Sequence, residues 1–214
     1  MTDANATFSS GASRPSSPQG EELRLTFPLT DLDALRELRA GQTLRIDGHV
    51  IGIRDATQIA MFDRGEKARM DLTGAALIHT APNVRKLGPG RYEKVCIGTT
   101  TSARMDRFTR GLLEGYGARA IIGKGGLLAG SLPVLQEFGG VYLAITGGAA
   151  ALETTQIEEI EEVEFEELMP ECLWKFRVRD FGPLTVAMDS HGVSLYEQIT
   201  AGARARLKEI VARF

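Results

Sequence analysis

One local pattern recurs through the middle of this chain and restricts its fold more than any other feature: a short apolar run, a turn rich in glycine or hydroxyl residues, and a helical segment. The apolar runs occupy residues 94–98, 118–123 and 141–146, and helices are expected over 103–116 and 132–138. Strands in such units lie parallel and are joined by right-handed crossovers, so the turns that follow them gather at one edge of a sheet. The sequence therefore predicts an α/β fold and places a functional site at that edge.

The regions on either side of this pattern predict other elements. A short helix is expected between an N-cap at Thr30 and a stop at Gly41, and the alternation of apolar and polar residues over 43–53 predicts a half-buried strand. Towards the C-terminus, Pro170 and Pro183 separate short apolar runs, which indicates a second, partly antiparallel layer. The strands and the terminal helix expected there span residues 163–167, 173–178, 184–189 and 194–214.

Composition places the chain among ordinary globular proteins. Of its 214 residues, 43% are hydrophobic and 25% are charged, which is enough apolar material for one compact core. Residues 1–22 are rich in Ser, Gly, Ala and Pro. We expect them to form a disordered tail, because they bury too little apolar surface to offset the entropy of ordering. The folded domain is expected over residues 23–214.

The charge pattern and the hydropathy exclude several kinds of partner. A formal net charge of -3, with Lys and Arg scattered along the chain, gives no basic surface for nucleic acid or for an anionic membrane. No stretch approaches the roughly 18 consecutive apolar residues of a membrane span, and the first residues show no signal-peptide pattern. We therefore expect a cytoplasmic protein with neither a nucleic-acid nor a membrane partner.

The residues that commonly bind metals or act as nucleophiles show no recognisable spacing. Cys96 and Cys172 lie too far apart for a local metal motif, and we expect both to be small buried hydrophobes. The eight glutamates from Glu153 to Glu167 predict a solvated face, or a rim that matches a basic partner, rather than a metal site. None of the three histidines has an obvious nucleophile beside it, so structural roles are expected for His49, His79 and His191.

Hydroxyl groups and positive charges follow three of the expected strands. The turn 98–104 carries four hydroxyl groups and ends in an arginine, Lys124 stands between two glycines after the next strand, and Arg54 follows the first strand. The hydroxyl groups also fit a simple helix cap, and Arg54 with Asp55 also fits a surface ion pair. Lys124 favours an anion site, because three cations at one sheet edge suit a ligand with two carboxylates. The glycines around Lys124 match neither a P-loop nor a dinucleotide fingerprint.

Several separated motifs carry a resemblance to a known family. They are G-T-T-T-S-A-R-M-D at 98–106, G-K-G-G at 123–126, Q-I-E-E-I-E-E-V at 156–163, F-G-P-L at 181–184 and D-S-H-G at 189–192. In this order they closely resemble the beta subunit of two-subunit iron-sulfur hydro-lyases, the group that contains class I fumarases and L(+)-tartrate dehydratase. The likeness runs from about residue 25 to about residue 195.

The resemblance implies a swivelling three-layer β/β/α domain with a mostly parallel central sheet and a second, smaller β layer. Such a domain closes over a partner alpha subunit that carries a [4Fe-4S] cluster, and the αβ pairs are expected to dimerise further. The resemblance also implies that Arg54, Arg104 and Lys124 hold the substrate carboxylates and that Thr100 is the general base. A threonine hydroxyl is a very weak acid, so Thr100 would need a carboxylate or an imidazole from the partner.

The activity that the resemblance implies is the reversible hydration or dehydration of a C4-type dicarboxylate. Fumarate, tartrate and mesaconate all remain open as substrates. One departure keeps an alternative open, since the family usually has a histidine four residues after the arginine of its Arg-Asp motif and this chain has Gln58. A neutral amide carries no positive charge and relays no proton. The alternative is a dicarboxylate-binding or regulatory module that lacks catalysis.

Overall fold

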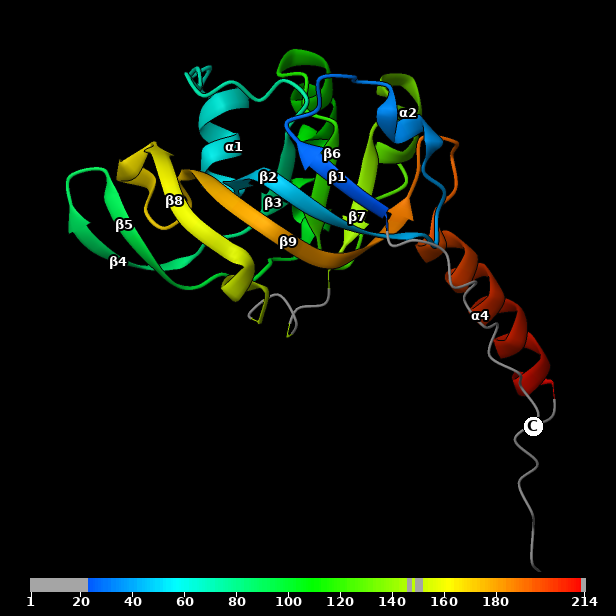
Figure 1. Ribbon diagram of the computed structural model, residues 1–214. Coiled ribbons are helices and arrows are strands. Elements are labelled where there is room, and N and C mark those ends of the chain that lie inside the picture. Colours follow the sequence, from blue (N-terminus) through cyan, green and yellow to red (C-terminus); the bar gives the residue numbers. More distant parts are fainter. Residues whose placement is uncertain (1–22, 146–147, 149–151, 213–214) are drawn as a thin grey trace, which may run out of the picture.

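A seven-stranded sheet forms the body of the molecule in the computed structural model, which describes residues 23–145, 148 and 152–212 (Figure 1). The strands neighbour one another in the order β1-β2-β3-β6-β7-β9-β8. Their bounds are Leu23–Phe27 (β1), Thr43–Ile53 (β2), Ala76–His79 (β3), Ala120–Gly123 (β6), Val141–Ala144 (β7), Ile157–Glu164 (β8) and Leu173–Met188 (β9). The expected tail over 1–22 lies outside the described residues, as does most of the glycine-rich turn after β7.

The strands that lead to the predicted site edge run parallel. The parallel pairs are β1–β2, β2–β3, β3–β6 and β6–β7. β9 is antiparallel to its neighbours and pairs with β2 as well as with β7, so the pairings run in a ring through β2, β3, β6, β7 and β9. These pairings confirm the prediction of an α/β fold with a mostly parallel sheet. The strands expected over 43–53, 118–123 and 141–146 appear as β2, β6 and β7, whereas the division into three layers stays a prediction.

Both faces of the sheet are buried. Successive residues of β3 alternate between two apolar clusters, because Ala76 and Ile78 belong to one cluster and Leu77 belongs to the other. The first cluster includes Trp174 of β9, and the second includes Met61 from a helix that covers the sheet. Such double burial is typical of parallel strands and produces short apolar runs without alternation.

Helices cover the second cluster and follow the parallel strands. The helix expected over 103–116 is one helical run whose winding changes along its length, and the helices expected near 132–138 and 194–214 are confirmed. The bounds are Asp55–Phe62 (α1), Ser102–Phe108 (η2, a 3-10 helix), Gly111–Gly115 (η3, a π-helix), Ser131–Phe138 (α2) and Leu195–Val211 (α4). α4 extends away from the body of the molecule (Figure 1). Among the helices in the described part of the chain, none is both long and apolar enough to cross a membrane.

The helix predicted between Thr30 and Gly41 is much shorter in the structure. Only the four residues Ala34–Glu37 are helical, as a 3-10 turn (η1). The Asp31 side chain accepts the backbone N–H of Asp33 at 3.0 Å, and this local bond competes with helix formation. The backbone is already extended at Leu38, although that side chain is buried as the pattern predicts.

The strand expected over 94–98 is not part of the parallel sheet, which corrects the first of the three repeated units. Residues Arg91–Cys96 form β5, which pairs antiparallel with β4, Asn83–Gly88, in a separate two-stranded sheet. The parallel strand next to β6 is instead β3. Its four residues are all buried and show no alternation, so no pattern distinguished it from its surroundings.

The final third contains one long strand where two short ones were expected. β9 continues through Pro183, because a bulge leaves residues 182 and 183 outside the ladder between the pairs Leu44↔Leu184 and Ile46↔Phe181. A proline at such a bulge costs no ladder hydrogen bond. The strand expected at 163–167 starts earlier, as β8, and β8 and β9 are hydrogen-bonded into the large sheet.

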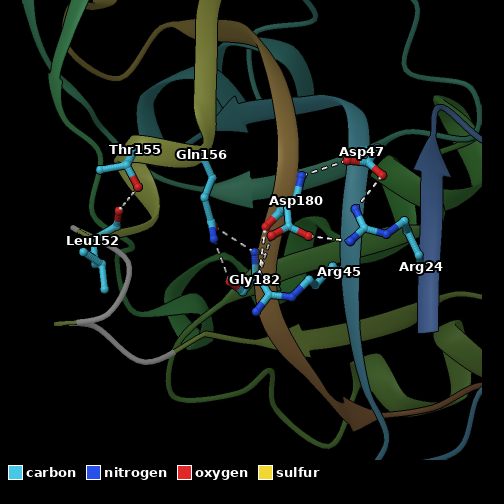
Figure 2. A network of polar contacts seen from close by, with 8 residues as sticks. All are labelled: Arg24, Arg45, Asp47, Leu152, Thr155, Gln156, Asp180 and Gly182. Atoms are coloured by element: carbon cyan, nitrogen blue, oxygen red, sulfur yellow. Dashed lines mark hydrogen bonds and ion pairs between the residues drawn. The ribbon is translucent and has the colours of Figure 1, made fainter. Parts of the chain in front are cut away.

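Side chains satisfy the backbone groups that this bulge leaves unpaired (Figure 2). Gln156 accepts the N–H of Gly182 at 3.0 Å and donates to its carbonyl at 3.0 Å. Arg45 donates to the same carbonyl at 2.9 Å and to the carbonyl of Asp180 at 3.0 Å. Asp180 has a positive φ of 56° and contacts Arg24 through its carboxylate. The bend is therefore a fixed part of the structure.

Candidate functional site

The four residues predicted to bind or react come together at the C-terminal edge of the parallel strands. Arg54 follows β2, Lys124 follows β6, and Thr100 lies beside the end of β3. Arg104 contacts Thr100 from the first turns of η2. An open pocket at this edge is lined by Arg54, Ala81, Asn83, Cys96, residues 98–101 and Lys124.

Backbone contacts place the threonine turn at this edge even though β5 lies outside the sheet. The N–H of Thr100 donates to the carbonyl of His79 at 2.9 Å, and the N–H of Ser102 donates to the carbonyl of Lys124 at 3.0 Å. The turn is therefore attached to the ends of β3 and β6. The N–H groups of Thr100 and Ser102 are thus paired within the protein, and the segment begins as a 3-10 helix.

Asp55 joins the two arginines of the site. Its Oδ2 atom lies 2.9 Å from an NH2 nitrogen of Arg104 and 3.4 Å from Nε of Arg54. The same Arg104 nitrogen donates to Thr100 Oγ1 at 3.0 Å. Two guanidinium groups thus converge on one carboxylate oxygen, and one of them also polarises the threonine hydroxyl. The arrangement can present two positive charges and a hydroxyl group to an anionic ligand.

Glu171 orients Arg54 from the loop before β9. Its Oε1 atom lies 3.2 Å from Nε of Arg54, and its Oε2 atom accepts the N–H of Ala56 at 2.8 Å, in the first turn of α1. The hydroxyl of Thr57 donates to the backbone carbonyl of Glu171. Sequence reasoning missed Glu171 altogether and treated Asp55 only as the other half of a surface ion pair. Neither residue shows a local signal, because both act through contacts between distant segments.

Lys124 is placed by two glycines with positive φ, Gly125 at 77° and Gly126 at 79°. A Cβ at Gly126 would meet the ring of Tyr196 at 2.7 Å, so the turn also packs closely against the start of α4. Among the described residues, none forms an ion pair with Lys124. Lys124 lines the pocket, and its ammonium group can supply a point charge to a ligand.

Behind the pocket lie two buried polar side chains, His79 and Gln58. Burial lowers the pKa of His79 to about 4, so its ring is neutral at physiological pH, and its Nδ1 atom lies 2.9 Å from Ser102 Oγ. Gln58 is 0% exposed on α1, and its Oε1 atom has no hydrogen-bond partner among the described residues. The other histidines do not line the pocket. His49 pairs with Glu161 at 2.9 Å, and His191 contacts the carbonyl of Arg36 at 2.7 Å.

Two of the eight glutamates expected on a solvated face are buried, which corrects that expectation for Glu153 and Glu164. Their exposed fractions are 5% and 6%. Glu164 has a partner, because its Oε2 atom accepts the N–H of Arg69 at 2.9 Å. Burial raises the pKa of Glu153 to about 7. The glutamates in the middle of β8 are largely exposed, and Arg177 pairs with Glu158, Glu159 and Glu161.

The two cysteines differ in their surroundings. Cys172 is 0% exposed, and burial raises the pKa of its thiol to about 11. Cys96 is partly exposed and lines the pocket, which corrects the expectation that it is buried. Within the described ranges, no group of three His, Cys, Asp or Glu side chains could hold a metal ion.

Comparison with known proteins finds one family along nearly the whole chain. The family model described as the fumarase C-terminus matches residues 4–199. The L(+)-tartrate dehydratase subunit beta of Escherichia coli K12 is 39% identical over 172 residues, which cover 80% of this chain and 85% of that protein. The subunit of the same name from Shigella boydii is 38% identical over the same shares of both chains.

A third relative is longer. A Geobacillus stearothermophilus protein, provisionally named as a class I fumarate hydratase, is 37% identical over 188 residues. The matched region covers 87% of this chain but only 36% of that protein. The region that corresponds to this chain is thus one part of a larger polypeptide in that relative.

Proposed function

The chain belongs to the fumarase C-terminus family, and from that premise we propose that it is the beta subunit of a two-subunit hydro-lyase. The proposed reaction is the reversible addition of water to, or its removal from, a C4-type dicarboxylate such as fumarate or tartrate. The names of the relatives, which are a dehydratase subunit and a fumarate hydratase, support this class of reaction.

The meeting of Arg54, Thr100, Arg104 and Lys124 at one sheet edge is the observation that carries the proposal. These residues come from three separate segments, so a surface ion pair or a helix cap alone does not account for their arrangement. Two arginines can hold carboxylates in a two-point contact, and the lysine adds a third positive charge. A diacid bound between them would meet positively charged side chains of this chain at both of its ends.

Thr100 is the proposed group next to the carbon that loses its proton. A substrate carboxylate on Arg104 would bring its neighbouring carbon towards Thr100 Oγ1, because the two side chains lie 3.0 Å apart. The Arg104 guanidinium stabilises negative charge on that oxygen. The hydroxyl group still needs an acceptor for its own proton, and we assign that acceptor, a carboxylate or an imidazole, to the partner subunit.

The proposed cofactor is a [4Fe-4S] cluster held by the alpha subunit and not by this chain. The thiols here fit that division, since Cys172 is buried in the core and Cys96 is one isolated thiol at the pocket. Such a cluster supplies Lewis-acid chemistry to the substrate hydroxyl when it is bound. This chain then binds and orients the diacid and closes over the partner as a swivelling domain. Further dimerisation of αβ pairs and a cytoplasmic location belong to the same proposal.

The first test compares two arginines on η2 in the reconstituted αβ complex. Arg104→Ala is expected to lower kcat/KM at least tenfold, because loss of a charge-assisted contact leaves a carboxylate unpaired and costs about 2–4 kcal/mol. Arg107→Ala is the matched control, since Arg107 lies on the same helix and pairs at 2.6 Å with Asp63. The measurement is an anaerobic assay with fumarate, malate, tartrate and mesaconate. Full activity of Arg104→Ala would remove this residue from the site.

A dicarboxylate-binding module without catalysis is the second candidate, and Gln58 is the observation that favours it. Its buried amide cannot take up a positive charge beside the pocket. The two candidates differ in what surrounds the gene. An adjacent reading frame for an alpha chain with three cluster cysteines supports the enzyme, and its absence supports the module.

A further inference from the structure

Three buried polar side chains form a chain directly behind the threonine turn. Tyr142 comes from β7, Ser102 begins η2 and His79 ends β3, and their exposed fractions are 0%, 0% and 1%. The Tyr142 hydroxyl donates to Ser102 Oγ at 3.0 Å, and Ser102 Oγ lies 2.9 Å from His79 Nδ1. Because β6 lies between β3 and β7, these hydrogen bonds connect the two strands that flank it.

Gly123 of β6 provides the space that these hydrogen bonds need. A Cβ at this position would overlap Ser102 Oγ and would lie 3.0 Å from the Tyr142 hydroxyl. Gly123 is not among the glycines with positive φ, so backbone conformation is not the reason for a glycine here. The reason is the close approach of two hydroxyl groups over the strand.

All three groups are uncharged at physiological pH. Burial raises the pKa of Tyr142, so its hydroxyl keeps its proton and can donate it to Ser102. Burial lowers the pKa of His79 to about 4, so its ring is neutral. Its Nδ1 atom contacts Ser102, whereas its buried Nε2 atom has no hydrogen-bond partner among the described residues, so Ser102 is the polar side chain that holds the ring.

The same residues hold the backbone on both sides of Thr100. The carbonyl of His79 accepts the N–H of Thr100 at 2.9 Å, and the N–H of Ser102 donates to the carbonyl of Lys124 at 3.0 Å. The side-chain hydrogen bond between Ser102 and His79 therefore joins the two residues whose backbone groups hold the turn that carries Thr100. In this turn the Thr100 hydroxyl is hydrogen-bonded to the Arg104 guanidinium at 3.0 Å.

We propose that Tyr142, Ser102 and His79 are positioning residues, which together hold the Thr100 hydroxyl in its reactive orientation. The proposal rests on the proposed hydro-lyase function. None of the three side chains lines the pocket, so they act through Thr100 and not on the substrate. Small displacements of a reacting group lower turnover strongly, whereas binding of the diacid depends on the three cations, which these side chains do not contact.

The kinetic test compares two Tyr→Phe variants in the assembled αβ enzyme. Tyr142→Phe removes the hydroxyl that orients Ser102, and we expect kcat to fall about tenfold while KM changes less than about threefold. Tyr92→Phe is the matched control, because its hydroxyl is also hydrogen-bonded, at 2.7 Å to Glu166, but belongs to the β4–β5 sheet. The control is expected to keep the kcat of the unchanged enzyme. Equal kcat values for both variants would overturn the proposal.

A second measurement does not depend on turnover. Nitrogen-15 NMR of histidine side chains in the full-length chain is expected to show His79 as a neutral ring at pH 7. In Ser102→Ala the Nδ1 signal of His79 is expected to shift, because Nδ1 loses its hydrogen-bond partner. An unchanged Nδ1 signal in this variant would show that Ser102 does not hold the ring, and would overturn the proposal. Absence of turnover with every diacid would instead count against the hydro-lyase function, and the NMR result would still decide the role of the three residues.

Discussion

Glu153 carries a carboxyl group that the fold buries without a full set of partners. It is 5% exposed, and its Oε2 atom has no hydrogen-bond partner within the described part of the chain. Burial raises the pKa of Glu153 from 4.5 to about 7, and the charge of Arg45 offsets only part of this effect. Between these pH values the folded state holds the proton more tightly than the unfolded state. The free energy of unfolding therefore contains a contribution that falls as pH rises through this window.

Glu153→Gln is expected to remove this contribution, because a neutral amide has no charge to bury. At pH 8 the variant should unfold with a free energy about 1–3 kcal/mol higher than that of the unchanged chain, and at pH 4.5 the difference should be smaller. Urea denaturation at both pH values measures the two differences. Glu162→Gln, on the exposed part of β8, serves as the control. A gain in stability that is the same at both pH values would contradict the explanation by charge burial.

At the same scale, the sequence predicted the cations of the site but not the acids that arrange them. Arg54 and Lys124 directly follow parallel strands, whose C-terminal ends meet at one edge of the sheet. Arg104 was predicted from a strand that lies outside that sheet, and the backbone bonds of Thr100 and Ser102 bring it to the same edge. Asp55 needed the folded structure, because its contact with Arg104 joins two segments far apart in the sequence. Glu171 comes from a third segment that shows no motif of its own.

At the scale of elements, the bulge in β9 depends on one side chain from η4, Glu153–Gln156. Gln156 makes two hydrogen bonds to the backbone of Gly182, both at 3.0 Å. Gln156→Ala is expected to lower the free energy of unfolding by about 1–3 kcal/mol, because a backbone N–H and part of a carbonyl lose their partner. Gln198→Ala, on the exposed face of α4, is expected to change it by less than about 0.5 kcal/mol. Equal unfolding midpoints of the two variants in urea would show that water replaces Gln156 at no cost.

The elements that the sequence predicted well are those with a complete local signal. β2 alternates between apolar and polar residues over most of its length, and α2 ends at Gly139, which adopts the left-handed conformation with φ 68°. β3 is short and entirely buried, so the exposed hairpin strand β5 was mistaken for the strand of the parallel sheet. β9 was divided at Pro183, because a bulge that removes a proline from the ladder leaves little trace in a single sequence.

At the scale of the whole molecule, α4 adds length without adding much to the core. Apolar residues along it remain exposed, with Ile199 at 71%, Leu207 at 59%, Ile210 at 51% and Val211 at 63%. Tyr196, near its start, instead packs with Tyr142 at a ring distance of 6.2 Å. The helix is therefore attached to the body through its first turn.

A pair of truncations tests this division of α4. Removal of residues 199–214 is expected to lower the Tm by less than about 4 °C, which corresponds to about 1 kcal/mol for a chain of this size. Removal from residue 195 onward also takes away the Tyr196 ring, and a clearly larger decrease in Tm is expected. Scanning calorimetry of both forms measures the difference. Equal decreases would mean that the exposed turns of the helix carry the stability instead.

The ring of pairings through β2, β3, β6, β7 and β9 has a mechanical consequence. An open sheet can change its twist and move one strand end relative to another. In a closed ring each strand is hydrogen-bonded on both sides, so it cannot shift without breaking hydrogen bonds to its neighbours. Arg54 and Lys124 follow two strands of that ring, so the distance between their backbone positions is fixed. Any approach of this edge to another protein must then be a movement of the entire body, with the span between the charges unchanged.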